Sequence, residues 1–422
     1  MSKAYPKYKP SGVEWLGDVP EHWGVKKLKY VSNTNTGFAF SSDDYTDEGI
    51  PLVRIGDILQ DGNVDIANAK KLPDEYLRTY RFVVVNKNDM LMAMTGATIG
   101  KAGRYQFDEK GLLNQRVCKF VPFKIFADYF WFILKSEQYA EHIKLTGFGG
   151  AQPNISDVQL LDFHFALPPL PEQQAIAAFL DRETGRIDAL IAKKERLLEL
   201  LAEQRTALIS RAVTKGLDAS VRLKPSGVEW LGDVPEHWKV LSLRYLFHIK
   251  AGGDLKEEFY SEERTDLHKY PIYTNSIKSD EAYGFTSKAF FKANSITVTG
   301  RGEIGYAVYR DHEFDAIIRL LVLTPKNSHP CKYYSYFINA MLVFFGGSTA
   351  VSQLSTEQIS PYKVFSPPLP EQQAIAAFLD RETAKIDALS AKVTTVIERL
   401  KEYRTALISS AVTGKIDVRE AV

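Results

Sequence analysis

Two long segments of the chain carry apolar side chains at alternating steps of four and three residues, the spacing of one face of an α-helix. The first segment begins at Pro171 and the second at Pro370, and glutamate follows each proline. Proline suits the first position of a helix, and glutamate in the first turn interacts favourably with the helix dipole. No further proline occurs before Val213 or Val412, and a glycine lies shortly beyond each. The pattern predicts two helices of about 42 residues, each about 60 Å long.

The same spacing is typical of a coiled-coil seam, in which apolar residues of one helix insert between those of its partner. The seam predicted for the first helix consists of Ile176, Leu180, Ile187, Leu190, Leu197, Leu201 and Leu208. The seam predicted for the second helix consists of Ile375, Leu379, Ile386, Leu389, Val393, Val396, Leu400 and Leu407. We therefore expect the two helices to pack against each other.

The segments outside these helices show short β-rich runs followed by one helix-like run. In the first half of the chain the expected strands are 82–85, 90–95 and 117–121, and the expected helix is 127–145. In the second half the expected strands are 295–299, 306–309 and 317–323, and the expected helix is 333–345. The predicted fold class is α+β, with two globular domains and two long paired helices.

The chain is a tandem duplication whose copies are identical in some blocks and dissimilar in others. The sequence KPSGVEWLGDVPEHW occurs at residues 9–23 and again, unchanged, at 224–238. The sequence PPLPEQQAIAAFLDRET occurs at residues 168–184 and again at 367–383. The stretches between these blocks, 24–167 and 239–366, barely resemble each other. We infer that the constant blocks make equivalent contacts and that the variable blocks bind two different things.

The duplication also predicts how the domains are arranged. We divide the chain into a first variable domain with its N-terminal conserved motif (1–167), a central conserved helix (168–216), a second variable domain with the repeated motif (217–366) and a C-terminal conserved helix (367–422). A pseudo-two-fold axis between the copies makes the paired helices antiparallel, so that they separate the variable domains as a stiff spacer and also hold the protein together. The alternative is a recent duplication whose loops drifted first, but drift would spread substitutions over the whole repeat.

Composition narrows the class of protein without identifying a partner. The chain has 422 residues, of which 45% are hydrophobic and 25% charged, as in globular proteins with two or three domains. Its apolar runs are far shorter than the roughly 20 residues that cross a bilayer, and its first ten residues are polar and rich in lysine and tyrosine. We expect a cytoplasmic protein that does not enter a membrane. The net charge of +1 neither favours nor excludes nucleic acid.

The sequence lacks the motifs that would indicate catalysis or a metal site. An adenine methyltransferase needs an Asn/Asp-Pro-Pro-aromatic loop, whereas the candidate segments here read LPPLP and SPPLP. GxSxG and HExxH do not occur, and the TGATIGK segment lacks the spacing of a phosphate-binding loop. Cys118 and Cys331 lie far apart, and the eight histidines are scattered. We predict a non-catalytic binding protein without a metal or cofactor of its own; the alternatives are an enzyme that methylates or cleaves its substrate and a purely protein-binding scaffold.

Polar residues near the turns of the variable domains are candidates for contacts with DNA. Arginine and lysine neutralise phosphates, arginine also binds guanine, and side-chain amides read adenine. A faint alignment of the two domains places Thr95 opposite Thr299. The candidates are Arg54, Thr95, Lys101, Arg104 and Arg116 in the first domain and Thr274, Asn275, Ser276, Lys278, Arg301, Arg310 and Arg319 in the second. The alternative for each charged residue is an ordinary solvated surface position.

The conserved blocks contain a second group of candidates, which would contact the scaffold or a partner protein. They are Trp15, Trp23, Glu172, Gln173, Trp230, Trp238, Glu371 and Gln372. For the tryptophans, packing of each variable domain onto its own helix is an equally good interpretation.

The opening SGVEWLGDVPEHW and the helix start PPLPEQQAIAAFLD, each present twice around dissimilar domains, resemble the specificity (S) subunit of type I restriction–modification systems. The resemblance covers essentially the whole chain. It implies that the variable domains are target recognition domains, each reading one half of a split site in double-stranded DNA, and that the paired helices fix the spacing of the half-sites. It also implies that two modification subunits, which methylate adenine, dock on the chain and that restriction subunits join this core. S-adenosylmethionine, ATP and magnesium would then be bound by the partner subunits.

Overall fold

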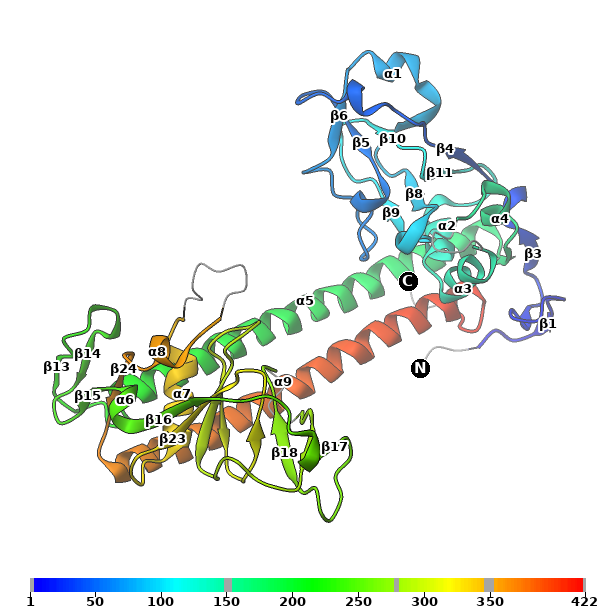
Figure 1. The fold of residues 1–422 in the computed structure, drawn as a ribbon. Helices are drawn as coiled ribbons and strands as arrows, with labels where there is room; N and C mark the ends of the chain where they lie inside the picture. The colour runs from blue at the N-terminus through cyan, green and yellow to red at the C-terminus, as the bar shows by residue number, and fades with distance from the viewer. Residues whose placement is uncertain (1–3, 148–153, 277–280, 345–352, 420–422) are drawn as a thin grey trace. The chain divides into compact units, whose positions relative to one another are not determined.

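The computed structural model describes residues 4–147, 154–276, 281–344 and 353–419. Its two longest elements are the helices α5 (Leu170–Lys215, 46 residues) and α9 (Leu369–Val412, 44 residues), which confirm the two predicted helices (Figure 1). Among the described residues, no helix combines the length and the apolar character that crossing a bilayer requires.

The chain divides into two compact units. Unit 1 comprises Met1–Lys194 and Thr395–Val422, and unit 2 comprises Glu195–Thr394. Each unit therefore contains one variable domain, the first part of one long helix and the last part of the other.

The first variable domain contains two four-stranded sheets (Figure 1). The first sheet is antiparallel and has the order β4-β11-β8-β9. Its strands are β4 (Ser32–Thr36), β11 (Val117–Pro122), β8 (Met90–Ala93) and β9 (Ala102–Arg104). In the second sheet, of order β6-β5-β10-β7, the pair β5 and β10 is parallel. Its strands are β6 (Lys70–Leu72), β5 (Ile50–Val53), β10 (Gly111–Leu113) and β7 (Val84–Val85).

Shorter elements complete this domain. Two-stranded pairs are formed by β1 (Tyr8–Pro10) with β2 (Asp18–Pro20) and by β3 (Gly24–Lys27) with β12 (His164–Leu167). The α-helices are α1 (Tyr76–Thr79), α2 (Ala127–Leu134), α3 (Glu137–Thr146) and α4 (Asp157–Leu161). The 3₁₀ helices are η1 (Leu28–Tyr30), η2 (Ser42–Asp44), η3 (Ile55–Asp57), η4 (Arg81–Val83) and η5 (Gly96–Thr98).

The second variable domain repeats this topology although its sequence is different. Its antiparallel sheet has the order β16-β23-β20-β21, with β16 (Phe247–Ala251), β23 (Leu321–Pro325), β20 (Ser295–Val298) and β21 (Ala307–Arg310). Its other sheet, β17-β19-β18-β22, again contains one parallel pair, β18 with β22. The strands are β17 (Tyr260–Ser261), β19 (Gly284–Thr286), β18 (Tyr270–Tyr273) and β22 (Asp315–Ala316). The α+β class is therefore confirmed for both domains.

The remaining elements of the second domain also have counterparts in the first. The pairs β13 (Leu223–Pro225) with β14 (Asp233–Pro235) and β15 (Lys239–Ser242) with β24 (Lys363–Ser366) correspond to β1 with β2 and to β3 with β12. The helices are α6 (Leu243–Leu246), α7 (Cys331–Met341), α8 (Thr356–Ile359), η6 (Glu229–Leu231) and η7 (Glu257–Phe259).

Some predicted elements differ from the observed ones for local reasons. The helix expected over 127–145 is two helices, because the Ser136 hydroxyl caps α3 by accepting a hydrogen bond from the Tyr139 amide at 3.3 Å. The strand expected over 82–85 is mostly the 3₁₀ helix η4, followed by the short strand β7. The strand expected over 317–323 begins only at Leu321, since the two residues 318 and 319 have positive φ angles.

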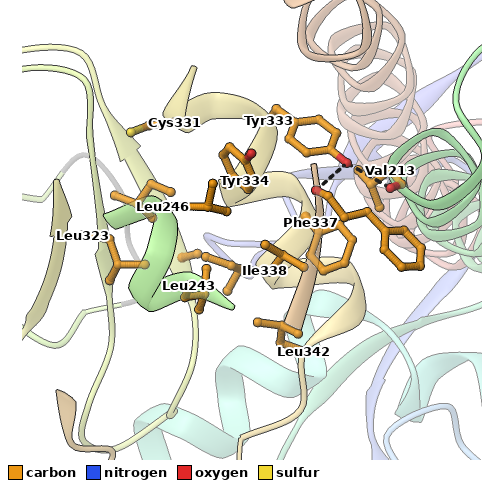
Figure 2. Close-up of a cluster of buried hydrophobic side chains, with 14 of the residues drawn as sticks. Val213, Leu243, Leu246, Leu323, Cys331, Tyr333, Tyr334, Phe337, Ile338 and Leu342 are labelled. Carbon is orange, nitrogen blue, oxygen red and sulfur yellow. Dashed lines mark hydrogen bonds between the residues drawn. The ribbon is translucent and has the colours of Figure 1, made fainter. Parts of the chain in front are cut away.

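A buried tyrosine attaches each variable domain to the end of a long helix. In unit 2 the Tyr333 hydroxyl of α7 donates to the backbone oxygen of Val213 at 3.1 Å, near the end of α5 (Figure 2). In unit 1 the Tyr129 hydroxyl of α2 donates in the same way to the backbone oxygen of Val412 at 3.1 Å. Burial raises the pKa of both hydroxyls well above the ordinary value, so both stay protonated donors. The last turn of a helix leaves carbonyl groups without intrahelical partners, and these tyrosines satisfy one in each unit.

The long helices run antiparallel within each unit. In unit 1 the Arg404 guanidinium lies 3.1 Å from the Asp188 carboxylate, whereas the later residue Arg419 lies 3.9 Å from the earlier Glu172. In unit 2 the Arg205 guanidinium lies 3.1 Å from the Asp387 carboxylate. Helix pairing is thus observed in both units, with the orientation that the duplication predicts.

One of the two seam positions was predicted one residue too early along much of both helices. The predicted residues Leu180, Ile187, Leu201 and Leu379 are buried, and so are Val393 and Leu407. The intervening positions are wrong: Leu190, Leu389 and Val396 are exposed, and the residues that follow them or their heptad equivalents, Thr184, Ile191, Thr383 and Ile397, are buried instead. Ile176 and Ile375 are buried, but Ile375 belongs to the core of the second variable domain.

The physical reason for this shift lies in where the count began. The count from Ile176 takes four residues to Leu180 and then three to Glu183, whereas the observed seam takes three from the buried Ala177 to Leu180 and then four to Thr184. Ile191 follows Leu190 and Ile397 follows Val396, so apolar character does not distinguish the observed positions from the predicted ones. Leu197, Leu208, Ile386 and Leu400 are half-buried.

The adjacent residues Leu190 and Ile191 test the corrected seam. Leu190 is 40% exposed and Ile191 is 8% exposed. We expect Ile191→Ala to lower the free energy of unfolding by about 2 kcal/mol because it removes buried methyl groups. Leu190→Ala, the matched control, should change it by no more than about 0.5 kcal/mol. Urea unfolding of the two variants measures both values, and equal losses would contradict the corrected seam.

Candidate nucleic-acid interface

Each variable domain has a corner where three separate chain segments meet beside the antiparallel sheet. Corner 1 consists of Thr95, Gln115, Arg116 and Asn154, and corner 2 consists of Arg301, Ile318, Arg319 and Gln353. In corner 1 Thr95 forms an isolated β-bridge with Asn154, and in corner 2 Arg301 forms one with Gln353. The segment after the third strand of the sheet is thereby joined to the segment before α4 or α8.

Backbone hydrogen bonds show that the two corners are equivalent position by position. The Gln115 amide donates to the Phe38 oxygen at 3.0 Å, and the Ile318 amide donates to the Gly253 oxygen at 3.0 Å. These bonds make Gln115 the counterpart of Ile318, and therefore Arg116 the counterpart of Arg319.

The same bonding corrects the sequence alignment of the two domains. The Ile155 amide donates to the Met94 oxygen at 3.0 Å, and the Leu354 amide donates to the Gly300 oxygen at 2.8 Å. Met94 therefore corresponds to Gly300, and Thr95 corresponds to Arg301. The faint alignment placed Thr95 opposite Thr299, which was wrong by two residues because the turns that follow differ in length.

A glycine fixes the approach of the first strand to each corner. A Cβ atom added at Gly37 would lie 2.0 Å from the Asn114 backbone oxygen, and one at Gly252 would lie 2.4 Å from the Ala316 backbone oxygen. No side chain fits at such distances, so each glycine allows the close crossing that places the exposed pair 115–116 or 318–319.

Corner 1 is an open, polar hollow of about 610 Å³. Gln115 and Arg116 are exposed at its rim, and the Arg116 guanidinium lies 3.4 Å from the Thr95 hydroxyl. The side chain of Asn154, which is paired with Thr95 in the β-bridge, is exposed and also lines this hollow. An amide, a hydroxyl, a second amide and a guanidinium thus line one accessible surface, and these groups suit the base edges and phosphates of a duplex.

Corner 2 is held by Asn275, which was predicted to read DNA. Its side-chain oxygen accepts hydrogen bonds from the amides of Gly300 and Arg301 at 2.6 and 3.2 Å, and its side-chain nitrogen donates to the Ile318 oxygen. The amide group is thus occupied by the backbone of the corner, and Asn275 positions Ile318 and its neighbours. Thr274 and Ser276 flank Asn275, and the Ser276 amide donates to the Thr274 oxygen at 2.9 Å.

Two arginines of corner 2 have different environments. The Arg301 guanidinium donates from Nε and Nη2 to the Gln353 side-chain oxygen at 3.2 and 2.9 Å, which orients it along the bridge. The Arg319 side chain is exposed. The structure therefore brings the predicted residues Thr95 and Arg116 together in one corner, and Arg301 and Arg319 in the other.

The other predicted DNA contacts lie outside the corners. Arg310 is 4% exposed, and its guanidinium stacks over Tyr273 at 3.5 Å inside the second domain, so it does not reach the surface. Arg104 forms an ion pair with Asp128 at 3.0 Å. Lys278 lies outside the described residues.

Two more candidates of the first domain are half-buried. Arg54 precedes η3, and its backbone amide donates to the Asp57 carboxylate at 2.7 Å. Lys101 follows the turn after β8, and its amide donates to the Thr98 oxygen at 3.0 Å. Neither belongs to corner 1.

Sequence reasoning missed Gln115, Asn154, Ile318 and Gln353. Gln115 directly precedes the predicted Arg116, and Ile318 directly precedes the predicted Arg319. An alignment of Arg116 with Arg319 would have drawn attention to the residues beside them. The two domains differ in loop length around these arginines, so the sequence does not show that they correspond. Ile318 in addition fell within an expected strand.

One tryptophan, one histidine and one glutamate of the conserved blocks form the same contact in both units. The indole N–H groups of Trp23 and Trp238 donate to the carboxylates of Glu172 and Glu371 at 2.9 and 3.0 Å. The imidazole Nε2 atoms of His22 and His237 lie 2.6 and 2.8 Å from the same carboxylates. Both tryptophans are buried. These residues attach each variable domain to the first turn of its own long helix.

The two glutamines have a similar role in the chain. The side-chain nitrogens of Gln173 and Gln372 donate to the backbone oxygens of Pro168 and Pro367 at 2.8 and 2.7 Å. Both side chains are buried, so they brace the residues just before each helix.

Trp15 and Trp230 differ from the other conserved tryptophans because they are 43% and 51% exposed. They occupy identical places in the two copies of the repeat. Among the predicted scaffold and partner residues, these two present large apolar surface to the outside of their units.

Burial also explains the two cysteines. Cys118 and Cys331 are buried free thiols, and burial raises the pKa of each to about 12. In the part of the chain that the structure describes, no three histidine, cysteine, aspartate or glutamate side chains are grouped so that they could hold a metal ion.

Comparison with known proteins places the repeated units in a common family. Residues 20–200 and 235–399 both match the family model described as type I restriction modification DNA specificity domain. The chain is 24% identical to the EcoBI specificity subunit of Escherichia coli, over 96% of this chain and 88% of that protein. It is 23% identical to the putative MjaX specificity subunit of Methanocaldococcus jannaschii, over 96% of each chain. A match to a putative specificity subunit of Mycoplasma pneumoniae is 27% identical but spans 58% of this chain and 61% of that protein.

Solved structures share the fold. A chain from a study of complex assembly and conformational transition of the type I R-M system has a TM-score of 0.73 at 14% identity and covers 94% of this chain and 99% of its own. The HsdS subunit from Thermoanaerobacter tengcongensis has a TM-score of 0.52 at 15% identity and covers 94% of this chain and 98% of its own.

The two tryptophans of the second repeat test the role of the buried contact. Trp238→Phe removes the indole N–H that bonds Glu371, and we expect it to lower the free energy of unfolding by about 2 kcal/mol. Trp230→Phe keeps an exposed aromatic ring and should change that energy by no more than about 0.5 kcal/mol. Urea unfolding of the isolated chain compares them; a variant of Trp238 as stable as the original protein would show that the contact does not hold the domain on its helix.

Proposed function

Because the chain belongs to the type I restriction modification DNA specificity family, we propose that each of its units reads one half of a bipartite DNA target through its corner. The paired helices separate the two reading surfaces and set the number of base pairs between the half-sites. The chain recognises DNA and leaves methylation and cleavage to partner subunits, which bind S-adenosylmethionine, ATP and magnesium.

One observation carries this proposal: two corners with the same pattern of backbone hydrogen bonds display different exposed side chains in the two units. Arginine occupies one corner position in both units, as Arg116 and Arg319. The neighbouring position is Gln115 in one unit and Ile318 in the other. An arginine shared by both corners can bind the phosphate backbone or guanine, which occur in any DNA. A neighbouring residue that differs between the corners can contact different bases.

The conserved blocks support two copies of one partner. Trp15 and Trp230 are exposed at identical positions of identical sequence blocks, so the two units offer the same apolar group to a protein. Two modification subunits of one kind would meet equivalent surfaces, whereas a DNA target whose halves differ needs unlike surfaces. Restriction subunits would join the complex that these form.

A purely protein-binding scaffold remains the competing function. It would use the conserved blocks and the long helices, but it gives no role to exposed corners that differ between the units. A chain that catalyses the reaction itself is the other competitor. Methyl transfer to DNA by the isolated chain, measured with labelled S-adenosylmethionine, would contradict the proposal that it only recognises DNA.

Exchange of one variable domain tests independent reading. We expect replacement of residues 24–167 by the corresponding domain of another family member to change one half of the recognised sequence and to leave the other half unchanged. Sequencing of methylated adenines, in cells that express the chain with its modification subunits, identifies both halves. The reciprocal exchange of residues 239–366 is the matched control. Simultaneous change of both halves in either chimaera would refute independent reading.

The spacing role can be tested by lengthening both long helices. Insertion of two heptads into residues 192–203 of α5 and 391–402 of α9 keeps the seam in register and adds about 21 Å of helix. The gap between half-sites should grow by about six base pairs, because B-DNA rises about 3.4 Å per base pair. The same methylation mapping measures the gap, and an unchanged gap in a chain that still directs methylation would exclude a ruler.

A further inference from the structure

Gln115 and Ile318 occupy one and the same position of the two corners but have unrelated side chains. The backbone amide of each donates a hydrogen bond at 3.0 Å to the segment that follows the first strand, to the Phe38 oxygen in unit 1 and the Gly253 oxygen in unit 2. Both side chains are exposed, and each is followed by an exposed arginine. The same position of the hydrogen-bond pattern thus carries a polar amide in unit 1 and an apolar, branched group in unit 2, and the turn has positive φ angles at this pair in unit 2 but not in unit 1.

Ile318 has a backbone conformation that its side chain disfavours. Its φ angle is +52° and that of Arg319 is +60°, in the left-handed region. The other described residues with positive φ, apart from glycines, are Asn88 and Asn294, and asparagine tolerates this region. A β-branched residue there is unusual, and packing does not compensate for it because Ile318 is 47% exposed. Strain of this kind often marks a site where the side chain serves a function.

The corner is built to keep Ile318 in that conformation. Its amide is bonded to the Gly253 oxygen, and its carbonyl accepts from the Asn275 side chain, which also holds the amides of Gly300 and Arg301. The backbone on both sides of the isoleucine is therefore fixed, and the apolar group points outward from a rigid base beside Arg319.

We propose that this position determines one base pair of each half-site, with Gln115 reading an adenine in one half and Ile318 contacting the 5-methyl group of a thymine in the other. The inference rests on the proposed function. A glutamine amide offers one donor and one acceptor, which match N6 and N7 of adenine in the major groove. An apolar side chain forms no hydrogen bond with a base, but it can pack against the methyl group that distinguishes thymine in the major groove.

DNA explains this position better than a protein partner does. The conserved blocks would present the same surface to two copies of one subunit, whereas the position in question differs between the units. The adjacent exposed arginines also favour an anionic partner. In corner 2 the Arg301 guanidinium is occupied by Gln353, which leaves Arg319 as the exposed arginine beside Ile318.

The experiment uses the full chain assembled with its modification subunits. Methylation mapping first defines the two half-sites; if no bipartite sequence appears, the proposed function itself fails. Duplexes that contain the site are then made with each thymine replaced in turn by uracil, which removes the methyl group. We expect one uracil in the half-site of unit 2 to weaken binding about fourfold. Binding by Ile318→Asn should be insensitive to that same replacement.

Gln115 is tested with atomic changes in adenine. Replacement of each adenine by 7-deazaadenine removes N7, and we expect one such change in the half-site of unit 1 to weaken binding about fivefold, since it deletes one of two hydrogen bonds. Binding by Gln115→Ile should not respond to it. Each variant is the matched control of the other, because Ile318→Asn should keep the response in unit 1 and Gln115→Ile should keep the response to uracil in unit 2.

Stability separates a lost contact from a damaged fold. Asparagine tolerates the left-handed region, so Ile318→Asn should melt at the same temperature as the original chain or higher. A bipartite site with no response to uracil or deazaadenine, or with responses that persist in the variants, would overturn this inference and leave the proposed function intact. Ile318→Asn could instead assemble more weakly with the modification subunits while its DNA binding still responds to uracil. That result would show that Ile318 contacts a protein, and it would also overturn this inference.

Discussion

The structure depends on the attachment of each variable domain to the first turn of one long helix and to the last turn of the other. Trp23 and Trp238 donate to the half-buried carboxylates of Glu172 and Glu371 at the helix starts, and Tyr129 and Tyr333 donate to backbone oxygens at the helix ends. The last turn of any helix leaves backbone oxygens without intrahelical partners, and the two tyrosines satisfy one such oxygen in each unit. Because each unit combines the start of one helix and the end of the other, the antiparallel arrangement is part of each unit's own core.

The corners show how one fold carries two specificities. The β-bridges and the paired backbone hydrogen bonds join main-chain atoms, and the close crossing requires glycine at Gly37 and Gly252. Exposed side chains at the corners can therefore differ while the pattern of backbone hydrogen bonds stays the same. This separation of backbone framework and variable surface accounts for two domains that share a topology and almost no sequence.

The seam of the long helices illustrates the limit of periodic patterns. The sequence correctly indicated two helices and one set of seam positions, including Leu180 and Leu201. It assigned the second set one residue too early, because Leu190 and Ile191, like Val396 and Ile397, are equally apolar and the spacing alone does not distinguish them. Which of two neighbouring residues is buried depends on the partner helix and on the domain at each end, and neither is encoded in the spacing.

The sequence by itself determined the duplication, the two long helices, the α+β class and the family, since repeats, helix signals and motifs are properties of order along the chain. Tertiary structure decided which polar residues share a surface. Arg116 and Thr95 meet in one corner, Arg310 is buried under Tyr273, and Asn275 supports the backbone of Ile318. These outcomes depend on contacts between segments far apart in sequence, whose loops differ in length between the domains, so no local pattern contains them.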